Sequence, residues 1–129
     1  MFNCHRYTKV RASYGNQFPS LAWEFNVDNQ REELAFRVAR CSEKDNFSRE
    51  IAQAVLKRKP WFATHYNKEL PLVVNAIECL ESLIEGGDSF FNSPEERQFY
   101  DRAVNDYCMI MVMNMRLAGV HLIDIEDRL

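Results

Sequence analysis

Cationic and helix-capping residues gather between positions 37 and 49, and their types and spacing suit the binding of an anion. The cationic side chains of this stretch are those of Arg37, Arg40, Lys44 and Arg49. Asp45 and Asn46 are residue types that cap the start of a helix, where backbone N–H groups lack partners and attract negative charge. We therefore expect a strand-to-helix junction here that helps to bind a phosphate-bearing small molecule.

Catalytic chemistry has less support in the sequence. The chain lacks the glycine-rich motifs G-x-x-x-x-G-K and G-x-G-x-x-G and the nucleophile motif G-x-S-x-G. Cys41 lies near the expected helix start, a setting that activates a thiol, but the distant His65 or His121 would have to act as its base. We expect a protein that is not an enzyme and that holds no cofactor.

Cysteine and histidine residues are scattered singly along the chain. The four cysteines have no C-x-x-C spacing, and we expect them to be reduced thiols, some of them packed as small hydrophobic groups. A zinc site built from Cys4, His5 and distant partners is the alternative. Because spaced ligand pairs are absent, we expect no metal site.

Length and composition fit one domain with an apolar core. The chain has 129 residues, of which 47% are hydrophobic and 27% are charged. No apolar run approaches the ~20 residues that span a bilayer. The first residues lack a secretory signal pattern, so we expect a cytoplasmic protein without membrane attachment.

The net charge of −3 hides an asymmetry between the two halves of the sequence. Residues 1–60 contain 11 Lys and Arg against 7 Asp and Glu, whereas residues 61–129 contain 5 against 12. The acidic total disfavours general nucleic-acid binding, which needs a broad basic surface. The basic half suits a small anionic ligand, or self-association with the acidic half of another copy. The alternative is that both halves only carry solvated charges.

Alternation of apolar and polar residues predicts an antiparallel sheet over about residues 7–41. Its strands are expected near 7–13, 21–27 and 34–40. One face is apolar in the second and third strands, which contribute Leu21, Trp23, Phe25, Val27, Leu34, Phe36 and Val38. Arg11, Glu24 and Arg37 are expected on the solvent side.

Two helices follow in the pattern, at about 46–58 and 70–85. Ile51, Ala54 and Val55 form the apolar stripe of the first helix, which Pro60 ends. Pro71 suits the first turn of the second helix, and Gly86-Gly87 ends it. The outer face of the second helix is acidic and contains Glu78, Glu81 and Glu85. Residues 61–66 read as an aromatic linker between the two helices.

A third helix is predicted at about 94–117. Ser93 is its expected N-cap, Pro94 takes the first helical position, and Glu96 completes a capping box. Residues 107–113 are apolar almost all round and rich in methionine, so we expect self-association through this part. Residues 120–125 read as a short strand or an extended tail. The predicted fold is therefore a single α+β domain over 1–129, with a small N-terminal antiparallel sheet followed by three α-helices, in an oligomer.

The segment 41–49, Cys-Ser-Glu-Lys-Asp-Asn-Phe-Ser-Arg, resembles a motif of the phage Thoeris anti-defence family, whose members sequester cyclic ADP-ribose-type immune signals. The resemblance implies an N-terminal antiparallel sheet, C-terminal helices, a homo-oligomer (dimer or hexamer) and ligand binding at subunit junctions without cleavage. It transfers ligand-binding roles to Lys44, Asn46, Phe47 and Arg49. The family motif continues with Gly and Arg where this chain has Ala52 and Gln53, which leaves a different ligand or family open.

Further binding candidates come from the residues themselves. They are Arg40 at the junction, Phe91 and Asn92 before the long helix, and Arg97, Arg102 and Arg116 along it. Arginine and lysine would bind phosphates, an aromatic ring would stack on adenine, and asparagine would bind a base or ribose edge. The structural alternative is that Phe47 anchors its helix, Asn46 caps it and the arginines pair with neighbouring acids.

The expected function is a non-catalytic viral protein, located in the host cytoplasm, that binds and sequesters a cyclic ADP-ribose-type or cyclic nucleotide immune signal. One alternative is a protein-binding inhibitor whose acidic helical half docks on a basic host protein. Another is a nucleic-acid accessory protein that uses Arg37, Arg40 and residues 57–59.

Overall fold

The computed structural model describes the backbone at residues 2–12, 17–41, 49–116 and 120–128, and the side chains at residues 4–5, 21–40, 50–87 and 89–111. A five-stranded antiparallel sheet has the strand order β4-β3-β2-β1-β5. Its strands are β1 (Phe2–Ala12), β2 (Gln17–Asp28), β3 (Glu33–Cys41), β4 (Phe62–His65) and β5 (Val120–Arg128).

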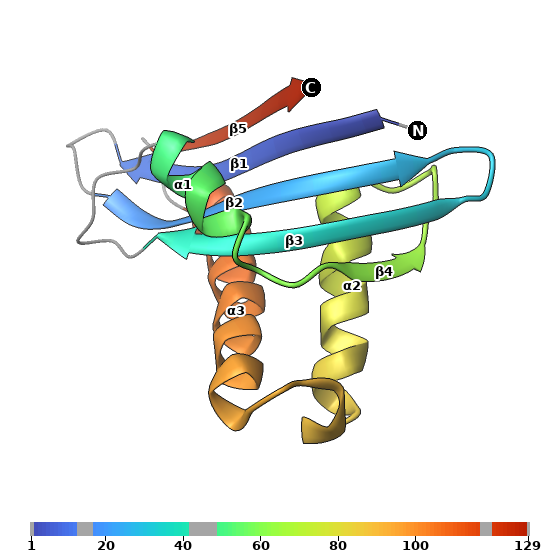
Figure 1. Ribbon diagram of the computed structural model, residues 1–129. Helices are drawn as coiled ribbons and strands as arrows, with labels where there is room; N and C mark the ends of the chain where they lie inside the picture. The colour runs from blue at the N-terminus through green and yellow to red at the C-terminus, as the bar shows by residue number, and fades with distance from the viewer. Residues whose placement is uncertain (1, 13–16, 42–48, 117–119, 129) are drawn as a thin grey trace.

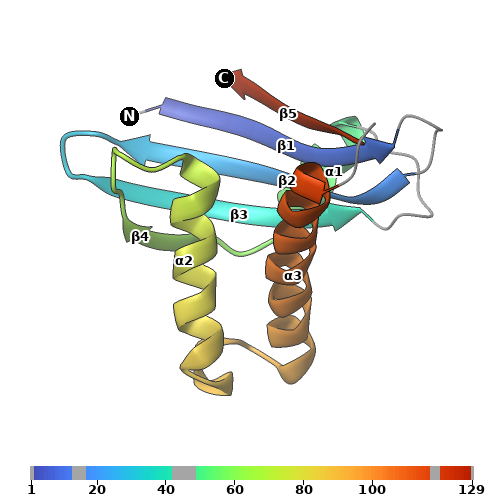
Figure 2. The same cartoon turned by 180° about the vertical axis from the view of Figure 1, so that it is seen from behind.

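Three α-helices cover the sheet unequally. Helices α2 (Leu72–Glu85) and α3 (Pro94–Arg116) stand side by side on one face, and the short helix α1 (Arg49–Leu56) lies on the other (Figures 1 and 2). The 3₁₀ turn η1 (Asp88–Phe90) lies between α2 and α3. The predicted α+β class, with an N-terminal antiparallel sheet followed by three helices, is confirmed.

The sheet is larger than the sequence predicted. Strand β1 begins at Phe2 rather than near residue 7. The interpretation of 61–66 as a linker was wrong, because Phe62–His65 pairs with β3 as an edge strand. The segment at 120–125 is the start of β5, which pairs along its whole length with β1. Both extra strands, β4 and β5, are edge strands that pair with the sheet formed by the first three strands.

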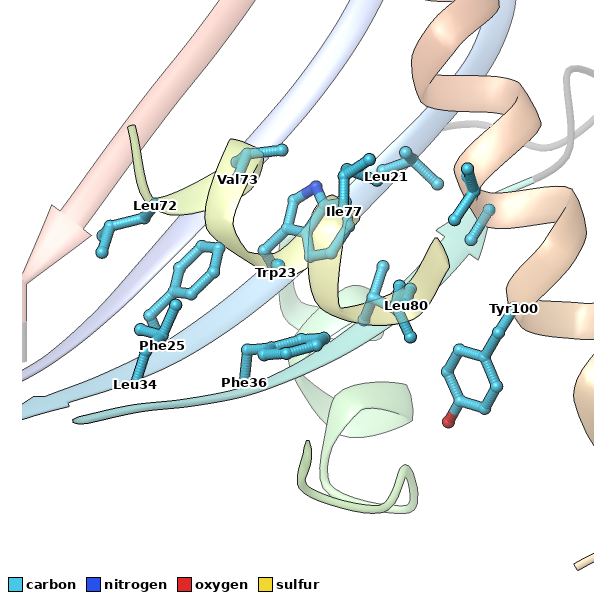
Figure 3. Packing of buried hydrophobic residues seen from close by; sticks show 14 of the residues in the cluster. Leu21, Trp23, Phe25, Leu34, Phe36, Leu72, Val73, Ile77, Leu80 and Tyr100 are labelled. Atoms are coloured by element: carbon cyan, nitrogen blue, oxygen red, sulfur yellow. The ribbon is translucent and has the colours of Figure 1, made fainter. Parts of the chain in front are cut away.

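The core lies between the sheet and helices α2 and α3, as Figure 3 shows. The predicted apolar faces of β2 and β3 are confirmed, since Trp23, Phe25 and Phe36 are fully buried. Helix α2 contributes Leu72, Val73, Ala76, Ile77 and Leu80, and α3 contributes Tyr100, Ala103 and Val104. Burying such large apolar side chains is the main stabilising term of a domain of this size.

The predicted boundaries of α2 and the start of α3 are confirmed. Pro71 is the N-cap residue of α2, and Gly86 is its C-cap, followed by Gly87 at φ 95°, a conformation that favours glycine. The Ser93 hydroxyl accepts a hydrogen bond from the Glu96 backbone N–H at 3.1 Å. These local signals therefore set the helix ends as the sequence indicated.

The predicted apolar stripe of α1 was wrong in part. Ile51 is 65% exposed, whereas Leu56 is fully buried against Ala22 and Ala39 of the sheet. Ala52 and Val55 pack beside Leu56. In a helix of only two turns, one large side chain over two alanines decides which face turns inward, and Ile51 then points away.

The second half of α3 is incompletely covered. Ile110 is fully buried, but Met109 and Met111 are 38% and 37% exposed. This agrees with the sequence argument that the helix has more apolar surface than one domain can cover. No helix among the residues that the structure describes is long and apolar enough to cross a membrane.

Candidate functional site

The predicted strand-to-helix junction lies between the end of β3 at Cys41 and the start of α1 at Arg49. Its helical end, α1, lies on the face of the sheet opposite α2 and α3 (Figure 1). Lys44, Asn46 and Phe47 lie outside the described residues, as does the side chain of Arg49. The two cations described at this junction are Arg37 and Arg40, and their partners decide how much positive charge remains there.

Arg37 belongs to a buried ionic row that crosses β1, β2 and β3. Its Nη2 donates to both carboxylate oxygens of Glu24, at 3.0 and 3.1 Å, and the His5 ring Nε2 lies 3.0 Å from the same carboxylate. The Trp61 ring covers the guanidinium at 4.4 Å. The side chains of Glu24 and Arg37 are only 11% and 13% exposed. The expectation that they face solvent was therefore wrong, because strand pairing and Trp61 enclose them.

The Arg40 side chain lies on the face of the sheet opposite Arg37, where it contacts α3. Its Nε donates to the Asp106 carboxylate of α3 at 2.7 Å, and both side chains are largely buried. A short charge-assisted hydrogen bond of this kind fixes a guanidinium and neutralises its charge. Both described cations thus already have a carboxylate partner in the chain. An anion at the junction would have to use Lys44, Arg49 and backbone N–H groups.

A shallow hollow of about 280 Å³ lies at the other end of the molecule, where α2 meets α3. Its lining consists of Ile84, Pro94, Arg97, Gln98 and Asp101. Arg97 Nη2 donates to the Ile84 backbone oxygen at 2.7 Å, so this cation caps the C-terminal end of α2. With a guanidinium, an amide and a carboxylate, the hollow offers donors and acceptors of both charges rather than a purely cationic surface.

The remaining predicted residues are distributed along α3 and before it. Phe91 is buried and stacks on Tyr100 with ring centroids 5.8 Å apart, which makes it a core residue rather than a base-stacking platform. Asn92 and Arg102 are exposed. Arg116 is the last residue of α3, and its side chain is outside the described part of the chain.

Within one chain, the predicted residues form two separate groups. Arg40 is held at Asp106, whereas Phe91, Asn92 and Arg97 lie toward the start of α3. Arg97 and Asp106 are nine positions apart in α3, which corresponds to about 14 Å along the axis. A single small ligand bound to one chain would contact one of these groups and not both.

The ionic partners of Arg37 and Arg40 were missed by reasoning from the sequence. Alternation placed Glu24 and Arg37 on the same face, but only the strand register sets them opposite each other and sets His5 opposite Glu24. The partner of Arg40 lies 66 positions away on another element. No local signal in the sequence identifies such a pair.

The two thiols with shifted pKa values are not activated as nucleophiles. Burial raises the pKa of the Cys79 thiol, and burial followed by the nearby Glu81 charge raises the pKa of the Cys108 thiol, so both favour the unreactive protonated form. Among the side chains that the structure describes, no group of three or more His, Cys, Asp or Glu residues is arranged to hold a metal ion.

The outer face of α2 is acidic, as predicted. Glu78, Glu81 and Glu85 are all exposed. Within the described part of the chain, no ion pair joins these carboxylates to a basic residue. This face is therefore a surface of unbalanced negative charge.

Comparisons with known proteins add no assignment. No protein-family model, no curated protein and no solved structure matches this chain. The arguments for its function therefore come from its residues and their geometry.

Proposed function

We propose that this protein is a non-catalytic binding protein that sequesters a cyclic ADP-ribose-type or cyclic nucleotide immune signal, acting in the host cytoplasm as a viral anti-defence protein. The observation that carries the proposal is the position of the 41–49 motif. It begins at Cys41, the last residue of β3, and ends at Arg49, the first residue of α1, a helix on the sheet face opposite α2 and α3. A helix that begins with Arg49, and that Lys44 precedes in the sequence, is a suitable place for a phosphate group.

The pairing of Arg37 and Arg40 changes the roles proposed for the cations. Arg37 joins β3 to β2 through Glu24, and Arg40 joins β3 to α3 through Asp106. The proposed ligand contacts are therefore Lys44 and Arg49 on phosphate, Asn46 on a base or ribose edge, and Phe47 against a base. Arg97, Arg102, Asn92 and Arg116 are proposed to contribute only if a second copy brings them near the junction.

Calorimetry tests this proposal directly. The purified protein is titrated with cyclic ADP-ribose isomers and with cyclic dinucleotides, and the recovered ligand is analysed by mass spectrometry. We expect heat of binding with at least one compound and recovery of that compound unchanged. Absence of heat with every compound would remove the proposal, and a converted ligand would replace sequestration by catalysis.

Matched variants locate the ligand. Arg49→Ala at the junction is compared with Arg31→Ala, which removes another cation at the opposite end of β3, where the Arg31 side chain is 76% exposed. Loss of one charge-assisted phosphate contact weakens binding by about tenfold or more. We expect that loss for Arg49→Ala and an unchanged affinity for Arg31→Ala.

Self-association is part of the same proposal. The exposed residues Cys108, Met109 and Met111 lie in the half of α3 through which the sequence predicts self-association. Substituting Met109 and Met111 by glutamate in one variant leaves the buried face of α3 unchanged. We expect this variant to have a lower mass by light scattering than the parent protein.

A protein-binding inhibitor is the second candidate function. The specific observation in its favour is the unbalanced acidic face of α2, formed by Glu78, Glu81 and Glu85. The nucleic-acid alternative has lost support, because Arg37 and Arg40 are paired and the Lys59 ammonium lies 3.8 Å from the centroid of the Phe99 ring. Of the five cations it required, Lys57 and Arg58 are the ones left exposed.

A further inference from the structure

The acidic residues of α2 lie where they weaken the helix. Glu78, Glu81 and Glu85 follow i, i+3, i+7 spacing on one face, and α2 contains no Lys, Arg or His. Like charges at this spacing repel, and negative charge near the C-terminal end of a helix opposes the helix dipole. Arg97 caps the last turn through the Ile84 oxygen, but one guanidinium does not balance three carboxylates. Because this arrangement lowers the stability of the helix, it suggests that the three carboxylates have a role other than stabilising the fold.

An exposed aromatic ring lies at the C-terminal end of the same helix. Phe90 is 56% exposed, and its ring packs on Gly86 at the end of α2 so closely that a Cβ there would overlap it. Exposed aromatic side chains beside charged residues are typical of protein–protein contact surfaces. We call Glu78, Glu81, Glu85 and Phe90 the acidic surface.

A second surface has the opposite charge and also exposes apolar side chains. Lys57 and Arg58 are exposed directly after α1, and their backbone N–H groups continue its hydrogen bonding to Gln53 and Val55. Ile51 lies in the first turn of α1 and is 65% exposed, and Trp61 is 44% exposed over Arg37. Glu50 is the exposed acid of α1. We call Ile51, Lys57, Arg58 and Trp61 the basic surface.

The two surfaces cannot meet within one molecule. Helix α1 lies on one face of the sheet and α2 on the other, as both ribbon views show (Figures 1 and 2). Each surface therefore keeps its charge and its exposed aromatic ring in the single chain. A second copy supplies the complement of each surface, because the copy carries both.

We propose that the acidic surface on α2 docks on the basic surface of a second copy of this chain, in a head-to-tail contact. Such a contact joins two different surfaces, so it builds a closed ring or an open chain rather than a simple two-fold pair. Glu81 and Glu85 face Lys57 and Arg58 across the contact, and Phe90 and Trp61 bury their exposed rings in it. The contact is independent of the proposed ligand and also distinct from the proposed contact through Met109 and Met111.

Reciprocal charge reversal tests the contact. One variant combines Glu81→Lys with Glu85→Lys, and the other combines Lys57→Glu with Arg58→Glu. Every protein in this comparison, the parent included, also carries Met109→Glu and Met111→Glu, so that the other proposed contact does not contribute. Each variant alone presents two surfaces of like charge, so we expect its self-association to weaken by about tenfold or more. A one-to-one mixture restores opposite charges at the contact, and we expect it to contain complexes of both variants, measured by native mass spectrometry with one variant isotopically labelled.

A matched control excludes a general effect of net charge. Glu33→Lys combined with Glu69→Lys changes the net charge by the same amount at exposed positions outside both surfaces. We expect this control to associate like the parent protein. Because surface charge pairs are screened by salt, raising ionic strength from about 0.05 M to about 0.5 M should dissociate the parent assembly.

Thermal stability, measured beside self-association, distinguishes a docking role of the acidic residues from a purely solubilising role. Removing unfavourable charge from the end of α2 should raise the melting temperature of the Glu81→Lys/Glu85→Lys variant by about 2 °C or more. A variant that is more stable but associates less supports the proposal. The proposal is overturned if the mixture contains no mixed complexes, or if each variant alone associates as the parent does.

Discussion

The two faces of the sheet are built from the same strands but are held in different ways. On the face of α2 and α3, Trp23, Phe25 and Phe36 are large, apolar and fully buried. On the face of α1, the alternate positions of the same strands carry small or charged residues, which are Ala22, Glu24, Arg37 and Ala39. The first face is stabilised by apolar area, the second by individual contacts. Changes on the second face can therefore alter binding without removing the core.

Truncating a core residue on the first face should have the largest effect. Phe36→Ala deletes a ring that is fully buried and stacked 5.6 Å from Phe62 between centroids. We expect a loss of about 3–5 kcal/mol in the free energy of unfolding, measured by urea denaturation. Ala35→Ser, its neighbour on the other face, should change stability by less than about 0.5 kcal/mol. Equal losses in both variants would contradict the difference between the faces.

Breaking the ionic row should have the next largest effect. Glu24→Gln leaves the Arg37 guanidinium enclosed without a carboxylate, and we expect a loss of about 2–3 kcal/mol, after allowance for the partial exposure of the pair. Replacing both partners, as Glu24→Leu with Arg37→Met, should recover most of that loss, because buried pairs are often replaceable by apolar residues. Denaturation of the two variants measures the difference. A double variant no more stable than the single one would mean that the fold itself requires the charges.

The two sides of α1 provide a smaller contrast. Leu56→Ala removes the one large side chain that α1 buries against Ala22 and Ala39, and we expect a loss of about 2 kcal/mol. Ile51→Ala changes a side chain that is 65% exposed and should cost less than about 0.5 kcal/mol. Thermal unfolding of both variants checks this prediction. A larger loss from Ile51→Ala would restore the stripe expected from the sequence.

Removing one hydroxyl from the core should have the smallest effect. Tyr100 is 1% exposed, and among the described residues its hydroxyl has no hydrogen-bond partner. Burial, and then the charge of Glu96, raise the pKa of this hydroxyl, so the folded state favours its neutral form. We expect Tyr100→Phe to unfold within about 1 kcal/mol of the parent protein at neutral pH.

The raised pKa of Tyr100 also predicts an alkaline effect. The stabilisation of the neutral hydroxyl is complete below the unfolded pKa of about 10 and is lost as pH rises above it, because the unfolded chain ionises first. The parent protein should therefore lose stability more steeply than Tyr100→Phe above about pH 10. Denaturation midpoints across this range measure the two slopes. Parallel slopes would show that Tyr100 is not held neutral.

The apolar face of the sheet was predictable from the sequence because alternation has a local cause. Each of Trp23, Phe25 and Phe36 is two residues from another apolar residue of its strand, so the pattern identifies the face without knowledge of the partner strand. The capping residue Ser93 and the glycines at 86 and 87 act equally locally. These features needed no tertiary information.

The edge strand β4 and the ion pairs were less predictable because their contacts are distant in sequence. Phe62–His65 becomes a strand only because β3 offers an edge to pair with, and Arg40 meets Asp106 only after α3 packs on the sheet. The candidate site was likewise only partly predictable from the sequence. The position of the junction between β3 and α1 was predictable, but the pairing of Arg37 and Arg40, which removes them as ligand contacts, was not.

The central claim is that the junction between β3 and α1 holds negative charge that comes from outside the chain. The most direct measurement is calorimetric titration of the parent protein, Arg49→Ala and Arg31→Ala with cyclic ADP-ribose isomers and cyclic dinucleotides. We predict that one compound binds the parent protein and Arg31→Ala equally, and binds Arg49→Ala at least about tenfold more weakly. Equal binding to all three proteins, or no binding to any of them, would contradict the claim.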